Sequence, residues 1–311
     1  MKNEYKIIIV AGPTASGKTS FSIKLAQALE GEIINADSLQ IYSEIPILSA
    51  QPTSYEKQSI PHHLFGYIKG NEEYTVARWI DDASACIKNS KKQSILVGGT
   101  GFYLKHLIFG LSPIPDIPED IRLQARQLLE ETGAIEFHSI LNQIDPRTAS
   151  LIEQNNAKRA LRAYEVIKAT GKSISCWQGQ NIGYFPISSF KLIILAPNRE
   201  LLYKNCNQRF LDMLDLGAIE EVKQLLKKQY PPLSSVLKSH GTPELTKYLS
   251  GEWSLEQAIV KSQQVVRNYA KRQTTWFKHQ FNHPELDVCF VENSIEEFEI
   301  IARECKKFLG S

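Results

Sequence analysis

The strongest constraint on the fold lies close to the N-terminus, at residues 12–19. This octapeptide fits the pattern G-x-x-x-x-G-K-[ST], follows a β-branched run at residues 7–10 and precedes a helical pattern at residues 20–29. Glycines at such a turn let the backbone wrap closely, so that several N–H groups converge on one phosphate at the helix N-terminus. We therefore predict a phosphate-binding loop made of Gly12, Pro13, Thr14, Ala15, Ser16, Gly17, Lys18 and Thr19.

Two side chains of this loop have predicted roles. Lys18 places a positive charge on the terminal phosphate, and the Thr19 hydroxyl lies where Mg²⁺ is held between protein and phosphate. We therefore expect Mg²⁺ as the cofactor, with Thr19 as its protein ligand. The loop alone indicates a phosphate compound and leaves open both its nature and the reaction.

Hydrophobic patterning divides the chain into three parts. Short apolar runs, each followed by a turn and a helical pattern, indicate strands of a parallel α/β sheet at residues 7–10, 33–36, 64–68, 95–97, 192–196 and 288–291. A long stretch between them has apolar residues at helical spacing and no strong strand. We predict a P-loop NTPase-like core at residues 1–112, a helical insertion domain contacting tRNA at residues 113–190, and core completion with C-terminal helices at residues 191–311.

Composition excludes several classes of protein. The 311 residues include 36 Lys and Arg and 34 Asp and Glu, so the net charge of +2 does not identify a partner. Five cysteines, odd in number and never in a C-x-x-C pair, argue against a disulfide framework or a structural zinc site. We find neither a signal-peptide pattern nor an apolar run near the ~20 residues that span a bilayer. We expect a cytoplasmic monomer without membrane spans.

Two predicted strand ends carry residues suited to chemistry. Asp37 follows the second strand, at the carboxyl edge where the ligand crevices of α/β sheets open, although an aspartate there can equally cap the next helix. The strand at residues 95–97 is followed by Gly98, Gly99 and Thr100, whereas P-loop kinases commonly have an Asp that holds Mg²⁺. Glycines permit close backbone approach, and a threonine hydroxyl can contact a leaving oxygen without adding negative charge.

Three motifs in this order and spacing resemble those of the bacterial tRNA dimethylallyltransferases. They are the octapeptide at residues 12–19, Asp-Ser-Leu-Gln-Ile-Tyr at residues 37–42 and Gly-Gly-Thr-Gly-Phe-Tyr at residues 98–103. Further matches at residues 61–64, 158–165, 170–172 and 269–277 extend the resemblance over nearly the whole chain. The resemblance implies transfer of a dimethylallyl group from dimethylallyl diphosphate to N6 of the adenosine 3′-adjacent to the anticodon in tRNA, with release of diphosphate.

The resemblance also implies roles for individual residues. Asp37 corresponds to the general base, Thr100 to a leaving-group contact, and Arg209 to an arginine that reaches the diphosphate held by the loop. The positions that correspond to tRNA contacts are Asp37, Ser38, Leu39, Gln40, Thr100, Arg122, Lys158, Arg159, Ala160, Leu161 and Arg162. Two segments depart from the family pattern: residues 48–52, where Gln51 replaces a common lysine, and residues 239–245.

Local charge is compatible with an RNA partner. Residues 154–181 contain five basic residues against Glu165 alone, and residues 261–280 contain five with no acid, interleaved with Tyr269, Trp276 and Phe277. For the second window an ordinary solvated helix face over core aromatic residues stays open. Three other functions also stay open: a P-loop small-molecule kinase, an adenine-nucleotide isopentenyltransferase and a nucleotide-dependent RNA-binding module.

Overall fold

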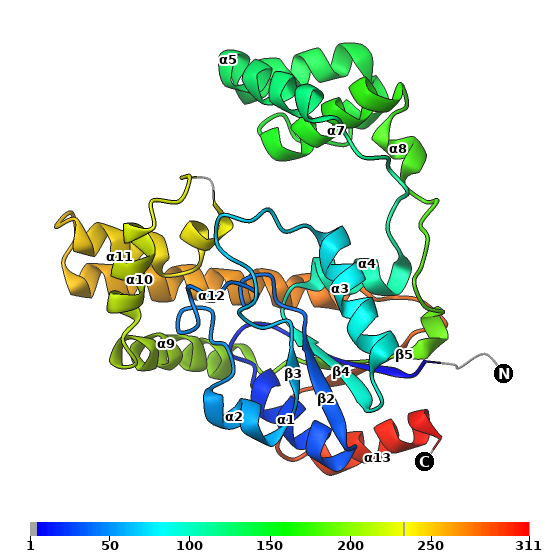
Figure 1. Cartoon of the computed structure of the whole chain (residues 1–311), viewed down its shortest axis with the longest axis vertical. Coiled ribbons are helices and arrows are strands. Elements are labelled where there is room, and N and C mark those ends of the chain that lie inside the picture. Colours follow the sequence, from blue (N-terminus) through cyan, green and yellow to red (C-terminus); the bar gives the residue numbers. More distant parts are fainter. Residues whose placement is uncertain (1–4, 233, 311) are drawn as a thin grey trace. The chain divides into compact units, whose positions relative to one another are not determined.

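A six-stranded sheet forms the centre of the computed structural model, which describes residues 5–232 and 234–310. The strand order is β3-β2-β4-β1-β5-β6, and each strand pairs in parallel with its neighbours (Figure 1). The strands are β1 (Ile7–Ala11), β2 (Gly31–Asn35), β3 (His62–His63), β4 (Gln93–Gly98), β5 (Phe190–Leu195) and β6 (Asp287–Val291). The predicted parallel α/β sheet is confirmed.

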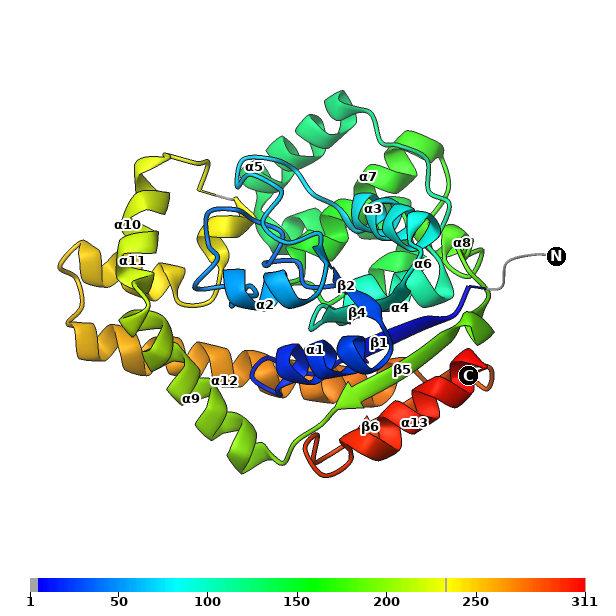
Figure 2. The same ribbon diagram turned by 60° about the horizontal axis from the view of Figure 1, so that its bottom comes forward.

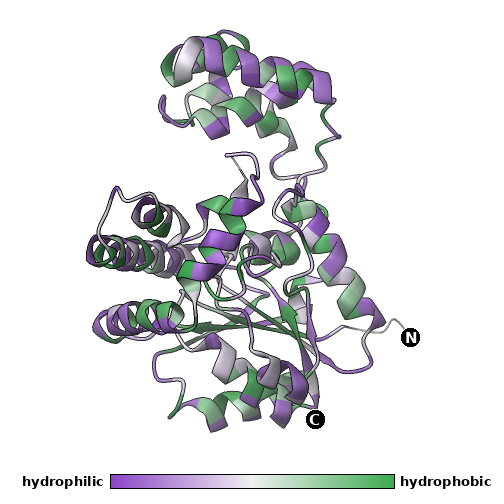
Figure 3. Ribbon diagram, turned by 60° about the vertical axis from the view of Figure 1, so that its left-hand side comes forward, coloured by the Kyte–Doolittle hydropathy of each residue, from purple (hydrophilic) through white to green (hydrophobic). Residues whose placement is uncertain are grey.

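The central strands are buried on both faces, as parallel strands covered by helices must be. Helices α1 (Lys18–Ala28) and α13 (Phe298–Leu309) cover one face through Phe21, Leu25 and Ile301 (Figure 2). On the other face α3 (Val76–Asn89) places Trp79, which is fully buried and donates its Nε1 hydrogen to the Asn35 carbonyl at 2.9 Å. Figure 3 shows hydrophobic residues along the strands of this sheet.

Two compact units divide the chain. Unit 1 comprises Met1–Ile108 and Tyr184–Ser311, and unit 2 comprises Phe109–Gly183. The other helices of unit 1 are α2 (Ser54–Ser59), α4 (Gly101–Phe109), α9 (Arg199–Asp215), α10 (Ala218–Lys227), α11 (Thr242–Leu249) and α12 (Leu255–Gln280), with 3-10 turns at Ile187–Ser189 and Ser235–Lys238. Within the described ranges every helix is too short or too polar to cross a membrane.

Unit 2 is helical and has a core of its own. It contains α5 (Glu119–Ile144), α6 (Pro146–Ala149), α7 (Ala157–Thr170) and α8 (Ile174–Trp177). Phe137 and Leu141 of α5 pack against Ala160 and Ala163 of α7. Gly133 has φ 78° and ψ 171°, so α5 consists of two helices joined at this residue.

Five of the six predicted strands are confirmed, with ends that differ by at most two residues. The strand predicted at residues 64–68 is wrong. Pairing with β2 ends at His63, and Ile68 makes an isolated bridge to Tyr42. Leu64 and Gly66 have φ values of 64° and 59°, and this left-handed backbone cannot continue a β ladder.

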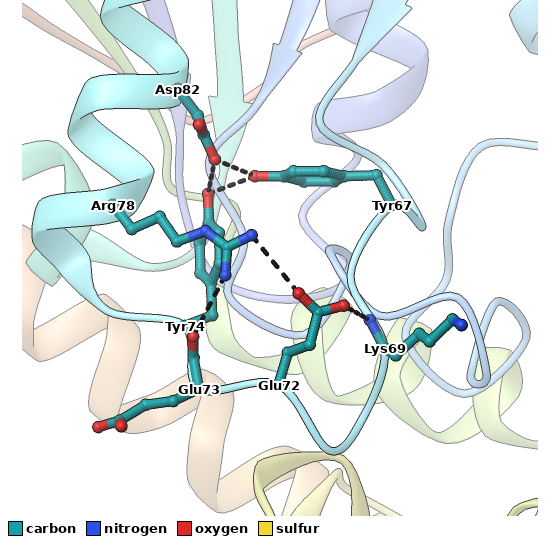
Figure 4. Close-up of polar contacts among 7 residues, drawn as sticks. All are labelled: Tyr67, Lys69, Glu72, Glu73, Tyr74, Arg78 and Asp82. Carbon is teal, nitrogen blue, oxygen red and sulfur yellow. Dashed lines mark hydrogen bonds and ion pairs between the residues drawn. The ribbon is translucent and has the colours of Figure 1, made fainter.

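A polar cluster holds the segment that follows β3 (Figure 4). The hydroxyls of Tyr67 and Tyr74 contact each other, and both donate to Asp82 Oδ2 at 2.8 Å. Burial raises the pKa of both phenols, so they stay protonated as donors. The cluster is extended by Lys69, Glu72, Glu73 and Arg78. Two of its members, Tyr67 and Lys69, flank Ile68, which bridges to Tyr42 in the loop that follows residue 37.

The tight approach of β4 to the end of β2 generates the first prediction. A Cβ at Gly98 would lie 2.1 Å from the Ala36 carbonyl oxygen, which also accepts a hydrogen bond from Thr100 N–H at 3.2 Å. We expect Gly98→Ala to lower the free energy of unfolding by about 1–3 kcal/mol, because backbone must move to make room. Urea denaturation measures this, with Ser94→Ala on the same strand as the control that adds no atom. Wild-type stability in Gly98→Ala would contradict the packing.

Candidate active site

The loop between β1 and α1 has the backbone shape of an anion cradle. Gly12 has a φ of 146°, and a Cβ there would lie 2.5 Å from the Leu195 carbonyl oxygen, so this position needs glycine. Gly17, at φ 88°, precedes a first turn of α1 that contains no acidic residue and has no side-chain cap. The amides at the α1 N-terminus are therefore oriented for an anion.

Two partly buried cations converge on this loop. Lys18 Nζ donates to the Pro13 carbonyl at 2.7 Å, and Arg209, on α9, donates from Nη2 to the Thr14 hydroxyl. Burial lowers the pKa of Lys18 to about 8 and also lowers the pKa of Arg209. Among residues 5–232 and 234–310, the salt bridges within 4.0 Å include neither cation. The site therefore holds positive charge suited to an anionic ligand.

Two hollows meet beside the loop. A cavity of about 840 Å³ is lined by residues that include Thr19, Asp37 and Arg209. A smaller hollow of about 40 Å³ shares Asp37 and Arg209 with that cavity. The rest of its lining is mainly apolar and includes Leu39, Leu48, Phe210, Met213, Val266 and Tyr269. Asp37 thus lies where the cationic cavity beside the loop adjoins an apolar hollow.

Asp37 is fixed by hydrogen bonds at the end of β2. Its N–H donates to Asn35 Oδ1 at 2.8 Å, and Asn35 Nδ2 donates to the carbonyls of Asp37 and Leu64, both at 3.0 Å. Asp37 Oδ1 accepts from Leu39 N–H at 3.0 Å, which closes a tight turn. The next helix, α2, is capped by Thr53, so the alternative that Asp37 is a helix cap is wrong.

Thr100, which lies between β4 and α4, supports the same turn. Its Oγ1 accepts from Ser38 N–H at 2.9 Å and donates to Ser38 Oγ at 3.2 Å. Neither hollow has Thr100 in its lining. The structure therefore places Thr100 beside the residues that follow Asp37, and its contact with a leaving group stays a prediction.

Two glutamines shape the wall of the larger cavity. Gln40 Nε2 donates to the carbonyls of Ser49 and Ala50, both at 2.9 Å. Gln51 Nε2 donates to the Tyr42 carbonyl at 2.7 Å. Gln51, which departs from the expected family pattern, therefore binds a backbone carbonyl of the cavity wall.

The predicted tRNA contacts on α7 differ in their exposure to solvent. Lys158, Arg159 and Arg162 are exposed, and Arg162 pairs with the carboxylate of Glu165 at 3.4 Å. Ala160, by contrast, is fully buried. The first three side chains are therefore the ones that can reach a phosphate.

The two other predicted contacts in unit 2 are less exposed. Leu161 packs against the helical core. Arg122, on α5, lies 4.0 Å from Glu119, and its Nε is buried without a hydrogen-bond partner. A role in tRNA binding stays a prediction for both.

Sequence reasoning missed three polar residues around the site. Asn205 Nδ2 donates to the Ala15 carbonyl at 3.3 Å, and Gln273 Oε1 accepts from Thr14 N–H at 2.8 Å. His240 lines the apolar hollow, and burial lowers its pKa. Weak signals for two of them were present: Gln273 lies in the matching segment 269–277, and His240 lies in the departing segment 239–245.

Known families and relatives match most of the chain. The family described as IPP transferase matches residues 40–280, and the family described as isopentenyl transferase matches residues 5–65. The tRNA dimethylallyltransferase of Ehrlichia canis is 42% identical over 298 residues, which cover 94% of this chain and 99% of that protein. The tRNA dimethylallyltransferase of Rickettsia bellii is 44% identical over 282 residues, which cover 88% of each.

Solved structures share the whole architecture. The tRNA isopentenylpyrophosphate transferase of Bacillus halodurans superposes with a TM-score of 0.69 at 31% identity, and 99% of each chain is covered. A eukaryotic dimethylallyltransferase acting on tRNA superposes with a TM-score of 0.83 at 27% identity, covering 97% of this chain and 78% of that chain. The predicted P-loop NTPase-like fold and the resemblance drawn from the motifs are confirmed.

The partly buried Lys18 generates a pH prediction. Because burial lowers its pKa to about 8, the side chain loses its charge as the pH rises through that value, whereas a bound anion raises the pKa again. We expect the affinity for inorganic diphosphate to fall above pH 8, with a slope of up to about tenfold per pH unit. Calorimetric titration with diphosphate from pH 6.5 to 9.5 measures this affinity.

Lys18→Arg is the control, since arginine stays charged throughout and its profile reports the ionisation of diphosphate itself. The difference between the two profiles isolates Lys18. Parallel profiles over the whole range would contradict a titrating lysine at this site.

Proposed function

Because the chain belongs to the IPP transferase family, we propose that it transfers a dimethylallyl group from dimethylallyl diphosphate to N6 of the adenosine 3′-adjacent to the anticodon in tRNA, releasing diphosphate. One observation carries the proposal: Asp37 lies at the junction of a cationic phosphate cavity and an apolar hollow. A diphosphate with a short apolar tail matches that junction. The relatives, named as tRNA-modifying transferases, favour this function over a kinase or an adenine-nucleotide isopentenyltransferase.

The loop is proposed to hold the donor's diphosphate. As the allylic C–O bond lengthens, negative charge builds on the departing diphosphate. Lys18, Arg209 and the α1 N-terminal amides stabilise that charge because they are already oriented and partly desolvated. A P-loop kinase would need a carboxylate beside the loop for its metal, and β4 is followed there by Gly99.

A divalent cation, proposed as Mg²⁺, fits the oxygens at this loop. Magnesium is usually held by few protein ligands together with substrate phosphates and water. Thr19 lines the cavity, and the nearby Ser16 hydroxyl is buried without a partner. Groups of three or more His, Cys, Asp or Glu arranged as a metal site do not occur in the described part of the chain. Thr19 is the proposed protein ligand, and the cation would neutralise charge on the diphosphate.

Asp37 is proposed as the general base. The adenine N6 lone pair is delocalised into the ring, so a proton must leave the nitrogen as the C–N bond forms. The hydrogen bonds that Asp37 donates to Asn35 and accepts from Leu39 fix its position relative to the loop. The proton passes from N6 to this carboxylate, while the C–O bond electrons leave with the diphosphate.

The target base must leave its stack to reach this carboxylate, which costs on the order of a few kcal/mol. Contacts with the tRNA backbone have to offset that cost. The exposed Lys158, Arg159 and Arg162 of α7 are proposed to supply them.

Asp37→Asn tests the base directly. The amide keeps an oxygen for the Leu39 N–H bond, so the turn is preserved while the proton acceptor is lost. We expect the single-turnover rate of prenyl transfer, at saturating donor and tRNA, to fall by roughly 10²- to 10⁴-fold. Transfer near the wild-type rate would assign the base to another group.

Arg159→Ala and Arg162→Ala test the tRNA surface. Each lost phosphate contact should weaken tRNA binding and reduce the slope of log affinity against log salt by about one. The effect of Arg162 should be the smaller, because Glu165 already partners it. Filter binding across a salt series measures both, with Lys223→Ala on α10 as the exposed-lysine control. Slopes equal to that of the control would remove the two arginines from the tRNA interface.

A further inference from the structure

A buried glutamine links the phosphate loop to the turn beside Asp37. Gln273, on α12, is 6% exposed. Its Oε1 accepts from Thr14 N–H at 2.8 Å, and its Nε2 donates to the Gly99 carbonyl, also at 2.8 Å. The partners lie 259 and 174 residues away along the chain. One side-chain amide therefore joins two loops that have no local connection.

Both ends of this link belong to the reaction site. On one side, the Thr14 hydroxyl contacts the guanidinium of Arg209. On the other side, Gly99 lies against the proposed base, since a Cβ built on it would be 3.5 Å from Asp37 Oδ2. That Cβ would also lie 2.4 Å from Gln273 Nε2, so the fit between the glycine and the amide is tight.

We propose that Gln273 is a positioning residue for prenyl transfer, an inference that rests on the proposed function. Its amide fixes the separation between the loop that holds the diphosphate and the carboxylate that receives the N6 proton. The Thr14 N–H is bound to Gln273, so this amide organises the loop instead of binding phosphate. Displacement requires the nitrogen, the allylic carbon and the departing oxygen in line, and a misplacement of about 1 Å can cost on the order of 10²-fold in rate.

The amide of Gln273 accepts a hydrogen bond at one end and donates one at the other, and this difference provides a test. A glutamate at position 273 has the shape of glutamine, but its ionised form presents an oxygen to the Gly99 carbonyl and repels it. The protonated form donates from one oxygen and accepts at the other, which reproduces the amide. Gln273→Glu should therefore be impaired at high pH and recover as the pH falls.

The ionisable groups that line the two hollows beside Thr14 include Asp37, Lys18, Arg209, Cys206, His240 and Tyr269. They are the same in the wild type and in each variant. Expressing every rate as a ratio to the wild type at the same pH removes their direct contribution.

The experiment measures the steady-state kcat and KM for tRNA, and the single-turnover rate of prenyl transfer, for the wild type, Gln273→Glu, Gln273→Leu and Gln263→Leu between pH 6 and pH 8.5. Gln263 is the matched control, because it also lies on α12 and donates to the Asn207 carbonyl of α9 at 3.1 Å. Wild-type transfer in the same assay tests the proposed function, so its absence is distinct from failure of the inference.

For Gln273→Leu we expect kcat to fall ten- to a hundredfold, with KM for tRNA within about threefold of the wild type. Gln263→Leu should stay within about threefold in both constants. The rate ratio of Gln273→Glu should rise at least fivefold from pH 8.5 to pH 6, whereas that of Gln273→Leu stays level.

Two results would overturn the inference. One is a kcat of Gln273→Leu equal to that of Gln263→Leu. The other is a Gln273→Glu ratio that does not change with pH, and this criterion decides the matter if the leucine variant fails to fold.

Discussion

The partial burial of Lys18 and Arg209 beside the phosphate loop is the constraint on which the rest of the structure depends. Moving a cation out of water is unfavourable, and the lowered pKa values of both side chains express that cost. Neither forms a salt bridge in the described part of the chain, so both positive charges are available to an anionic ligand. The surrounding helices must hold these groups in place without neutralising them. Helix α9 does so by carrying Arg209 to the Thr14 hydroxyl.

The same loop is used by many phosphate-binding proteins, and its neighbours decide the chemistry. Beside β1, β4 ends at Gly98 and is followed by Gly99, so the backbone of this turn comes close to the loop instead of presenting a metal-binding carboxylate. The carboxylate lies one strand further, at Asp37, where the apolar hollow adjoins the cavity. The proposed function uses this arrangement to keep the departing diphosphate apart from the incoming amine.

The sequence predicted those parts of the fold whose signals are local. Buried parallel strands appear in the sequence as short apolar runs, and the loop motif predicts a helix shortly after β1. The strand expected at residues 64–68 failed because Leu64 adopts a left-handed backbone, which its residue type does not signal. The sequence placed Asp37 correctly at the carboxyl edge of the sheet, but the hydrogen bond from Leu39 N–H that closes its turn was visible only in the structure. Gln273 could not be found by pattern because its two partners lie far away in the chain.

In the proposed function, the phosphate loop supports transfer of a dimethylallyl group and not of a phosphoryl group. Dimethylallyl diphosphate labelled separately in the allyl carbons and in the phosphorus, incubated with Mg²⁺ and unmodified tRNA, tests it most directly. The account predicts that the carbon label appears on N6 of the adenosine next to the anticodon, with an equal amount of phosphorus label released as intact diphosphate. Phosphorus label on the tRNA, or ATP cleavage by the protein without carbon transfer, would contradict it.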